Sequence, residues 1–138
     1  MTHVYYKDAV GALVVFDITR AATLAGAQNW RIDIEEKVFL PNSNPIPVVL
    51  CANKADLPRE SWAMTEEKIE SFAKRNKFHS HFLTSALENT YLSEAVDTLV
   101  HRVFELVEYT TLLSQGRQTP DSLKVNSTEN EQGCCRFG

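Results

Sequence analysis

The chain has 138 residues, enough for one domain, and its hydrophobic content of 43% is sufficient for a core. Its net charge is −4 and no basic stretch is evident, which argues against nucleic acid as a partner. It has no run of about 18 apolar residues that could cross a membrane, no apolar signal-peptide core in residues 1–8 and only three cysteines. We therefore expect a cytosolic protein without a disulfide framework.

The first part of the chain predicts a strand followed by a helix. A continuous apolar run at residues 12–18 is typical of a central parallel strand. Thr23 is a candidate N-cap for the next helix, whose apolar stripe leaves Arg31 outside it. Three prolines between residues 41 and 47 then end this helix. The expected stripe consists of Leu24, Ala27, Trp30, Ile34 and Val38.

A second apolar run, at residues 48–52, predicts a strand buried on both faces, and the polar loop 53–56 follows it. Thr65 is the candidate N-cap of the next helix and Asn76 its candidate end. A short strand is expected at residues 81–84. The apolar face of the second helix is expected to be Ile69, Phe72 and Ala73. A last helix starting near Leu92 is expected to bury Leu92, Val96, Leu99, Val103, Leu106 and Val107.

Strands and helices alternate in this order, which predicts a parallel α/β sheet with right-handed crossover connections. From residue 114 the composition changes to Gln, Ser, Thr, Asn and Glu without an apolar stripe. We therefore expect a folded domain at residues 1–113 and a disordered tail at residues 114–138.

The loop Asn53-Lys54-Ala55-Asp56 carries side chains that suit a guanine base, at the strand edge where ligands bind in open α/β sheets. Asp56 could accept hydrogen bonds from the ring N–H and the exocyclic amine of guanine. The Lys54 stem could lie over the ring, and Asn53 could tie the loop to its neighbours. Adenine would leave the carboxylate unpaired. The alternative is an ordinary polar turn after a strand.

Ser85-Ala86-Leu87 follows the next predicted strand. Its backbone N–H groups could donate to the guanine O6, and the Ser85 hydroxyl could brace the first loop. Such a turn is common in proteins of any function. Its position one β-α unit after the Asn-Lys-x-Asp loop is what favours the guanine interpretation.

Cys134 and Cys135 lie next to each other close to the C-terminus. Exposed paired cysteines on a mobile cytosolic tail are good acceptors for isoprenoid chains, and the alternatives are a chance pair or a redox pair. The tail carries no net charge, so stable membrane anchoring would need two lipids, which two cysteines could supply.

Two other groups of residues have simpler interpretations. His79 and His81 alternate along a strand without a third ligand nearby, so solvated strand histidines are expected rather than a metal site. Cys51 lies in a buried strand and is expected to be a small core residue.

Several stretches are similar to signature sequences of the Rab small GTPases. They are Tyr-Tyr-Lys-Asp-Ala-Val-Gly-Ala at residues 5–12 and Leu-Val-Val-Phe-Asp-Ile-Thr at residues 13–19. Residues 40–47, Leu-Pro-Asn-Ser-Asn-Pro-Ile-Pro, resemble the subgroup that serves melanosomes and other lysosome-related organelles. The resemblance covers essentially all of residues 1–135 and corresponds to the C-terminal two-thirds of a Rab protein.

The predicted site loops also match this family. Asn53 to Asp56 matches its guanine-specificity motif, and Thr84-Ser85-Ala86-Leu87 matches its second base-binding motif, with Leu87 in place of the commoner lysine. Cys134-Cys135 resembles the family's double geranylgeranylation signal, although Arg136-Phe137-Gly138 follows it here. Tyr5 matches one of three residues that form an effector-contact triad in the family.

The resemblance implies a partial small-GTPase fold of the P-loop NTPase type. This fold would have three layers, with three parallel strands and three helices, and would lack the first three strands of a six-stranded sheet. Its expected ligand is GTP or GDP, with Mg²⁺ in the intact family. The implied role is a lipid-anchored switch in vesicle traffic on the cytosolic face of endomembranes (trans-Golgi, endosomal and lysosome-related vesicles), with a soluble pool. The implied partners are Rab escort protein, geranylgeranyl transferase, GDP dissociation inhibitor, an exchange factor, a GTPase-activating protein and effectors.

The phosphate half of the family's site is not among these 138 residues. They contain no G-x-x-x-x-G-K-[ST], no switch I threonine and no D-x-x-G followed by a water-positioning glutamine, so no catalytic residue or Mg²⁺ ligand can be assigned. Met1 falls on an internal methionine of the family, which favours a truncated sequence over a redesigned site. Three interpretations stay open: a truncated Rab GTPase, a non-enzymatic prenylated adaptor or decoy that binds Rab partners without nucleotide, and a product without function of its own.

Overall fold

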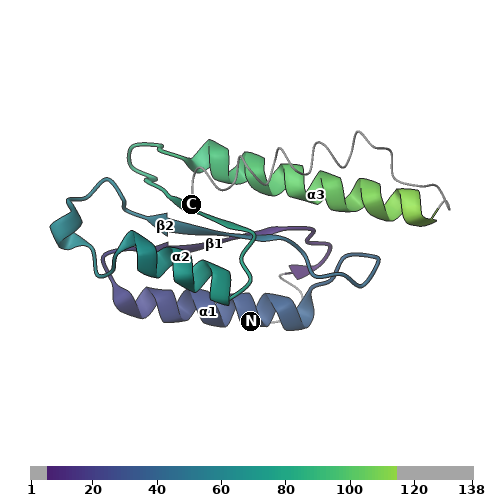
Figure 1. Ribbon diagram of the computed structural model, residues 1–138, viewed down its shortest axis with the longest axis horizontal. Coiled ribbons are helices and arrows are strands. Elements are labelled where there is room, and N and C mark those ends of the chain that lie inside the picture. Colours follow the sequence, from purple (N-terminus) through teal and green to yellow (C-terminus); the bar gives the residue numbers. More distant parts are fainter. Residues whose placement is uncertain (1–5, 115–138) are drawn as a thin grey trace.

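The computed structural model describes residues 6–114, with side chains described through residue 108. The elements are β1 (Ala12–Asp17), α1 (Ala21–Lys37), β2 (Val48–Asn53), a 3-10 turn (Arg59–Ser61), α2 (Glu66–Arg75), β3 (Ser80–Leu83) and α3 (Leu92–Ser114). The three strands form one parallel sheet in the order β1-β2-β3. Helices α1 and α2 cover one face of this sheet and α3 covers the other (Figure 1). The three-layer α/β fold expected from the sequence is therefore confirmed.

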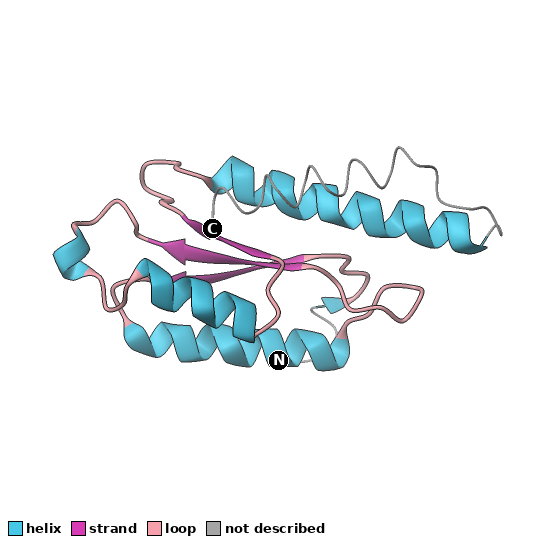
Figure 2. Cartoon of the chain, viewed as in Figure 1, coloured by secondary structure: helices cyan, strands magenta, loops and turns pink. Residues whose placement is uncertain are grey.

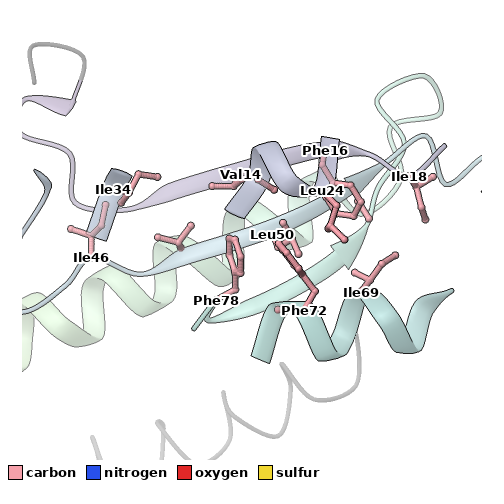
Figure 3. Packing of buried hydrophobic residues seen from close by; sticks show 14 of the residues in the cluster. Val14, Phe16, Ile18, Leu24, Ile34, Ile46, Leu50, Ile69, Phe72 and Phe78 are labelled. Atoms are coloured by element: carbon pink, nitrogen blue, oxygen red, sulfur yellow. The ribbon is translucent and has the colours of Figure 1, made fainter. Parts of the chain in front are cut away.

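The main core lies between the sheet and the helices α1 and α2 (Figure 3). Val14 and Phe16 enter it from β1, Leu50 from β2 and Phe72 from α2. A smaller cluster beneath α3 contains Val49, Cys51, Phe82 and Ala95. Every residue from Val48 to Ala52 is buried, as the sequence predicts for a strand covered on both faces.

The ends of α2 are confirmed as predicted. Thr65 caps the helix by accepting a hydrogen bond from the Lys68 amide, and Asn76 ends it. Acidic side chains at the first turn and basic ones at the last complement the helix dipole. Ile69, Phe72 and Ala73 are its buried face.

The strand β1 is not central in the sheet that the structure describes. It pairs only with β2 there, and its side chains on the α3 side, Leu13 and Val15, are 40% and 58% exposed. Its unbroken apolar sequence led to the prediction of a central strand. An apolar run indicates that the faces of a strand tend to be covered, but it does not say which segment covers them.

Helix α1 differs from prediction in its cap and in the centre of its buried stripe. Arg20 is the N-cap, and Thr23 instead lies in the first turn, where its hydroxyl donates to backbone carbonyls of Asp17 and Arg20. Trp30 is 39% exposed, whereas Arg31 is buried. The Arg31 side chain is drawn inward because Nη2 donates to the Lys77 carbonyl at 3.3 Å.

Two further predictions of burial are wrong. Among the described side chains of α3 the buried one is Ala95, and Val96 and Val107 are 44% and 42% exposed. Leu99 and Leu106, which were also predicted to be buried, are partly buried and pack against the core. His81 is buried rather than solvated, and burial lowers the pKa of its imidazole. Among the described residues, no helix is both long and apolar enough to cross a bilayer.

Candidate functional site

The candidate site lies where the parallel strands end. The strand arrows point toward one end of the sheet, and the loops that follow them lie at that end (Figure 2). Asn53 is the last residue of β2 and is paired in register with Asp17, the last residue of β1. Thr84 directly follows β3 and donates its amide to the Ala52 carbonyl at 2.9 Å. Parallel pairing therefore brings three loops of distant sequence to one edge.

The Ser85 hydroxyl donates a hydrogen bond of 2.7 Å to Oδ1 of Asp56. Ser85 is almost fully buried, and its Oγ also accepts the Glu88 amide at 3.0 Å. The Asp56 carboxylate is therefore held by the Ser85 side chain, which is buried away from solvent. The second oxygen of Asp56, Oδ2, accepts no hydrogen bond from the part of the chain that the structure describes.

Asn53 joins the two loops. Its Oδ1 accepts the Ala86 amide at 3.1 Å, and its backbone carbonyl accepts the Ile18 amide at 3.1 Å. The Ala55 amide donates to the Thr84 carbonyl at 3.0 Å, which adds a second link between the same loops. Asn53 therefore makes hydrogen bonds to neighbouring loops, as the sequence suggested that it could.

The backbone donors of the second loop are only partly available. The Ser85 amide donates to the Thr90 carbonyl at 3.2 Å, and the Ala86 amide is taken by Asn53. Within the described residues the Leu87 amide has no acceptor, and its side chain is 86% exposed. Of the three predicted backbone donors, the Leu87 amide is therefore the one that makes no hydrogen bond within the described residues.

Lys54 pairs with a residue that the sequence analysis did not single out. Its Nζ lies 2.7 Å from Oδ2 of Asp17, and the Lys54 backbone adopts a φ of 70°, in the left-handed region. Hydrogen bonds from Lys54 and then from Thr19 lower the pKa of Asp17 to about 2. The Thr19 amide and hydroxyl both donate to Oδ1 of Asp17, at 2.9 and 2.6 Å.

The local sequence around Asp17 could have indicated that its side chain is part of the loop structure. Asp17 is an acidic residue that ends an apolar strand, followed two residues later by a threonine, which is the pattern of a side chain that bonds its own turn. The Lys54 stem, predicted to lie over a base, is directed to this carboxylate at the edge of the site.

The remaining predicted residues are placed as follows. Tyr5, Cys134 and Cys135 lie outside the described residues. Cys51 is a buried free cysteine, as expected, and burial raises the pKa of its thiol to about 11. Within residues 6–114, no group of three His, Cys, Asp or Glu side chains could hold a metal ion.

The chain matches known proteins over nearly its whole length. The Ras family matches residues 1–105. Ras-related protein Rab-32 of Homo sapiens is 39% identical over 98% of this chain and 60% of its own length. Ras-related protein Rab-7L1 of Homo sapiens is 34% identical over 98% of this chain and 64% of its own length. Ras-related protein Rab-32B of Dictyostelium discoideum is 35% identical over 99% of this chain and 52% of its own length.

The chain therefore spans between about half and two-thirds of the length of these relatives. The family match agrees with the parallel α/β fold. This chain belongs to the Ras family, and it resembles Ras-related proteins Rab-32 and Rab-7L1 over nearly its whole length.

Proposed function

We propose that the loops at residues 53–56 and 85–87 recognise the guanine base of GTP and GDP. The observation that carries this proposal is the Asp56 carboxylate, held by Ser85 at 2.7 Å with its second oxygen open. A carboxylate has about four acceptor sites, so it can keep the Ser85 bond and still accept both donors of guanine. The open Leu87 amide is a donor suited to the guanine O6.

The same geometry would reject adenine. Adenine has a ring acceptor where guanine has an N–H, and it lacks the amine at the neighbouring carbon. A carboxylate that faces it would lose water without gaining a hydrogen bond, which costs about 1–3 kcal/mol or more for a charged group. Specificity would thus come from one side chain, Asp56, whose direction is set by Ser85.

For the whole protein we propose a Rab-type switch in vesicle traffic, cycling between GTP and GDP with Mg²⁺. Such a protein would be lipid-anchored through Cys134 and Cys135 on the cytosolic face of endomembranes. It would use escort and prenylating proteins, GDP dissociation inhibitor, exchange and activating factors, and effectors that contact Tyr5. Family membership supports this role.

A second candidate is a prenylated adaptor or decoy that binds Rab partners without nucleotide. It is favoured by one observation, namely that these 138 residues include no phosphate-binding motif. The two candidates differ in whether the loops after β2 and β3 bind a guanine base at all.

Base recognition is tested by titrating the chain with GMP, IMP, AMP and XMP at millimolar concentration and following the Leu87 amide by NMR. These ligands share sugar and phosphate, so differences between them report the base. We expect GMP to bind more tightly than IMP, which lacks the amine, and AMP to cause no saturable shift. Equal responses to GMP and AMP would favour the adaptor.

The matched variants are Asp56→Asn and Asp97→Asn. An amide at position 56 accepts the ring N–H and donates to a carbonyl, so Asp56→Asn should prefer XMP over GMP. Asp97 is an exposed carboxylate of α3, and its replacement removes the same charge away from the loops. If both variants keep the order of the unsubstituted chain, Asp56 does not read the base.

A further inference from the structure

A hollow of about 420 Å³ lies on α1, and the described residues that line it are Gly26, Asn29, Trp30 and Asp33. These residues are three or four positions apart, so they share one face of the helix. The core residues Leu24, Ala27, Arg31 and Ile34 occupy a different face. The hollow is therefore separate from the core and is not built from the loops that end the strands.

Gly26 keeps this hollow open without a packing reason. A glycine inside a helix costs about 0.5–1 kcal/mol relative to alanine. Among the residues that the structure describes, a Cβ placed at Gly26 would meet no atom within 4 Å, so none of these neighbours requires a glycine there. Local rules of helix stability are broken most often where a site needs the space.

The walls of the hollow offer an aromatic face and polar acceptors. Trp30 is 39% exposed, and neither its indole nor the Asn29 amide is hydrogen-bonded within the described part of the chain. Oδ2 of Asp33 accepts the Tyr6 hydroxyl at 2.6 Å, which fixes the direction of the carboxylate. Its other oxygen pairs with Lys37, one turn along the same helix.

Asp33 is charged and can change its partner. Lys37, and then Tyr6, lower the pKa of the Asp33 carboxyl. The Lys37 pair is a surface ion pair between residues four apart, and such pairs contribute little to stability. An incoming cation that also gains an aromatic contact can replace it.

We infer that this hollow binds an arginine side chain of a partner protein, stacked on Trp30 and paired with Asp33. A guanidinium is planar, stays charged and has five N–H donors in a fixed fork. One face can lie on the indole while its edge donates to the Asp33 carboxylate and the Asn29 amide oxygen. A lysine offers the charge without the flat face.

The chain contains an internal example of the same arrangement. Cζ of Arg59 lies 4.6 Å from the centre of the Trp62 ring, and the same guanidinium donates to Glu66. Trp30 and Asp33 present the same pair of groups, an indole and a carboxylate. Within residues 6–114 no arginine or lysine stacks on Trp30. The arginine that completes the arrangement would come from outside.

The test uses the full 138-residue chain with 5-fluorotryptophan, so that Trp30 and Trp62 give separate ¹⁹F signals, assigned with Trp30→Phe. The probe is the peptide acetyl-Gly-Arg-Gly-amide, compared with the same peptide carrying citrulline or lysine. We expect a saturable shift of the Trp30 signal with arginine and at least about tenfold weaker binding with citrulline, which has the shape without the charge. Equal binding of arginine and citrulline, or a Trp30 signal that does not move, would overturn the inference.

Two variants locate the binding. Asp33→Asn should weaken the arginine peptide about tenfold, whereas Glu36→Gln, an exposed residue that does not line the hollow, should change it less than about twofold. Gly26→Leu should fill the hollow and remove the Trp30 response, with an unchanged Trp62 signal showing that the fold is kept. Unaltered binding in Gly26→Leu or Asp33→Asn would place the peptide elsewhere and reject the proposal.

Discussion

The Ser85 hydroxyl and the Asp56 carboxylate, 29 residues apart in sequence, are joined by a hydrogen bond of 2.7 Å. Ser85 follows β3 and Asp56 lies in the loop after β2, so this bond locks two loops at one edge of the sheet. Because Ser85 is buried, its hydroxyl has no competing water, and the direction of the carboxylate is set before any ligand arrives.

Removing the Ser85 hydroxyl should lower both the stability of the chain and the affinity of the site for a guanine base. Ser85→Ala leaves the Glu88 amide and one Asp56 oxygen without their partner, so we expect the free energy of unfolding to fall by about 1–3 kcal/mol. GMP affinity, measured by NMR titration, should fall several-fold. The control is Ser71→Ala, because within the described residues the Ser71 hydroxyl bonds only the Glu67 carbonyl of its own helix. Equal effects of the two substitutions on GMP would show that Ser85 does not position Asp56.

Much of this site could be predicted from the sequence, because the topology of a parallel sheet determines which loops lie together. Asn53 ends β2 and Ser85 lies two residues beyond the end of β3, and neighbouring parallel strands end at the same edge. Once the strands are placed, the two loops must meet. The sequence could not specify which donors stay open, because the Ala86 amide is taken by an Asn53 oxygen whose position depends on both loops.

Burial on the helices was harder to predict for a different reason. Helical spacing gives the width of an apolar stripe, but its centre depends on what lies beneath. In α1 a carbonyl at Lys77 holds Arg31 inward, which turns Trp30 toward solvent. In α3 the small side chain of Ala95 is the buried one, in the cluster with Val49 and Phe82. Both outcomes come from residues far away in the sequence.

The Asp17–Lys54 pair predicts an acid-sensitive stability. The pKa of Asp17 is lowered from 3.8 to about 2, so the ionised carboxylate favours the folded state. This contribution is fully present above about pH 4 and is lost as the pH falls toward 2. We expect Asp17→Asn to be less stable at pH 7 and to have a flatter dependence between pH 4 and 2. Urea unfolding across pH 2–7 measures this, with Asp97→Asn as the exposed control.

The same titration can contradict this account. If Asp17→Asn and the unsubstituted chain lose stability in parallel between pH 4 and 2, the ion pair does not contribute to folding. A loss confined to pH 5–7 would point instead to His81, whose pKa is lowered by burial and which favours the folded state only while neutral.

The 138-residue chain should not bind GTP at micromolar concentration. In this enzyme class the phosphates and Mg²⁺ are held by a glycine-rich loop with its lysine and serine or threonine, and these residues contain no such motif. Titration with a fluorescent GTP should show no saturable signal, with or without EDTA. Tight binding that EDTA abolishes would demonstrate a phosphate site that the sequence motifs do not reveal.

The open side of β1 should make this chain associate with itself. The amides of Ala12 and Ile18 point toward β2, so the amides of Leu13 and Val15 point away from it, along an edge with which no strand of residues 6–114 pairs. Leu99 and Val103 of α3 lie against Gly11, just before this strand. The adjoining flank of α3 is also apolar and between 42% and 63% exposed, at Val96, Val100, Phe104 and Val107.

We therefore expect the isolated chain to be poorly soluble because it associates with itself, and Val15→Lys, the background suited to the NMR and unfolding experiments, should shift it toward monomer. The charge interrupts the apolar surface beside the free edge, a common way to prevent strand pairing between chains. Phe39→Lys is the matched control, because Phe39 is 54% exposed but lies outside the sheet's strands. Sedimentation velocity and thermal unfolding measure the result. A sharp, cooperative transition from a monomer of unsubstituted sequence would mean that the edge of β1 is protected in a way that its 58% exposed Val15 does not suggest.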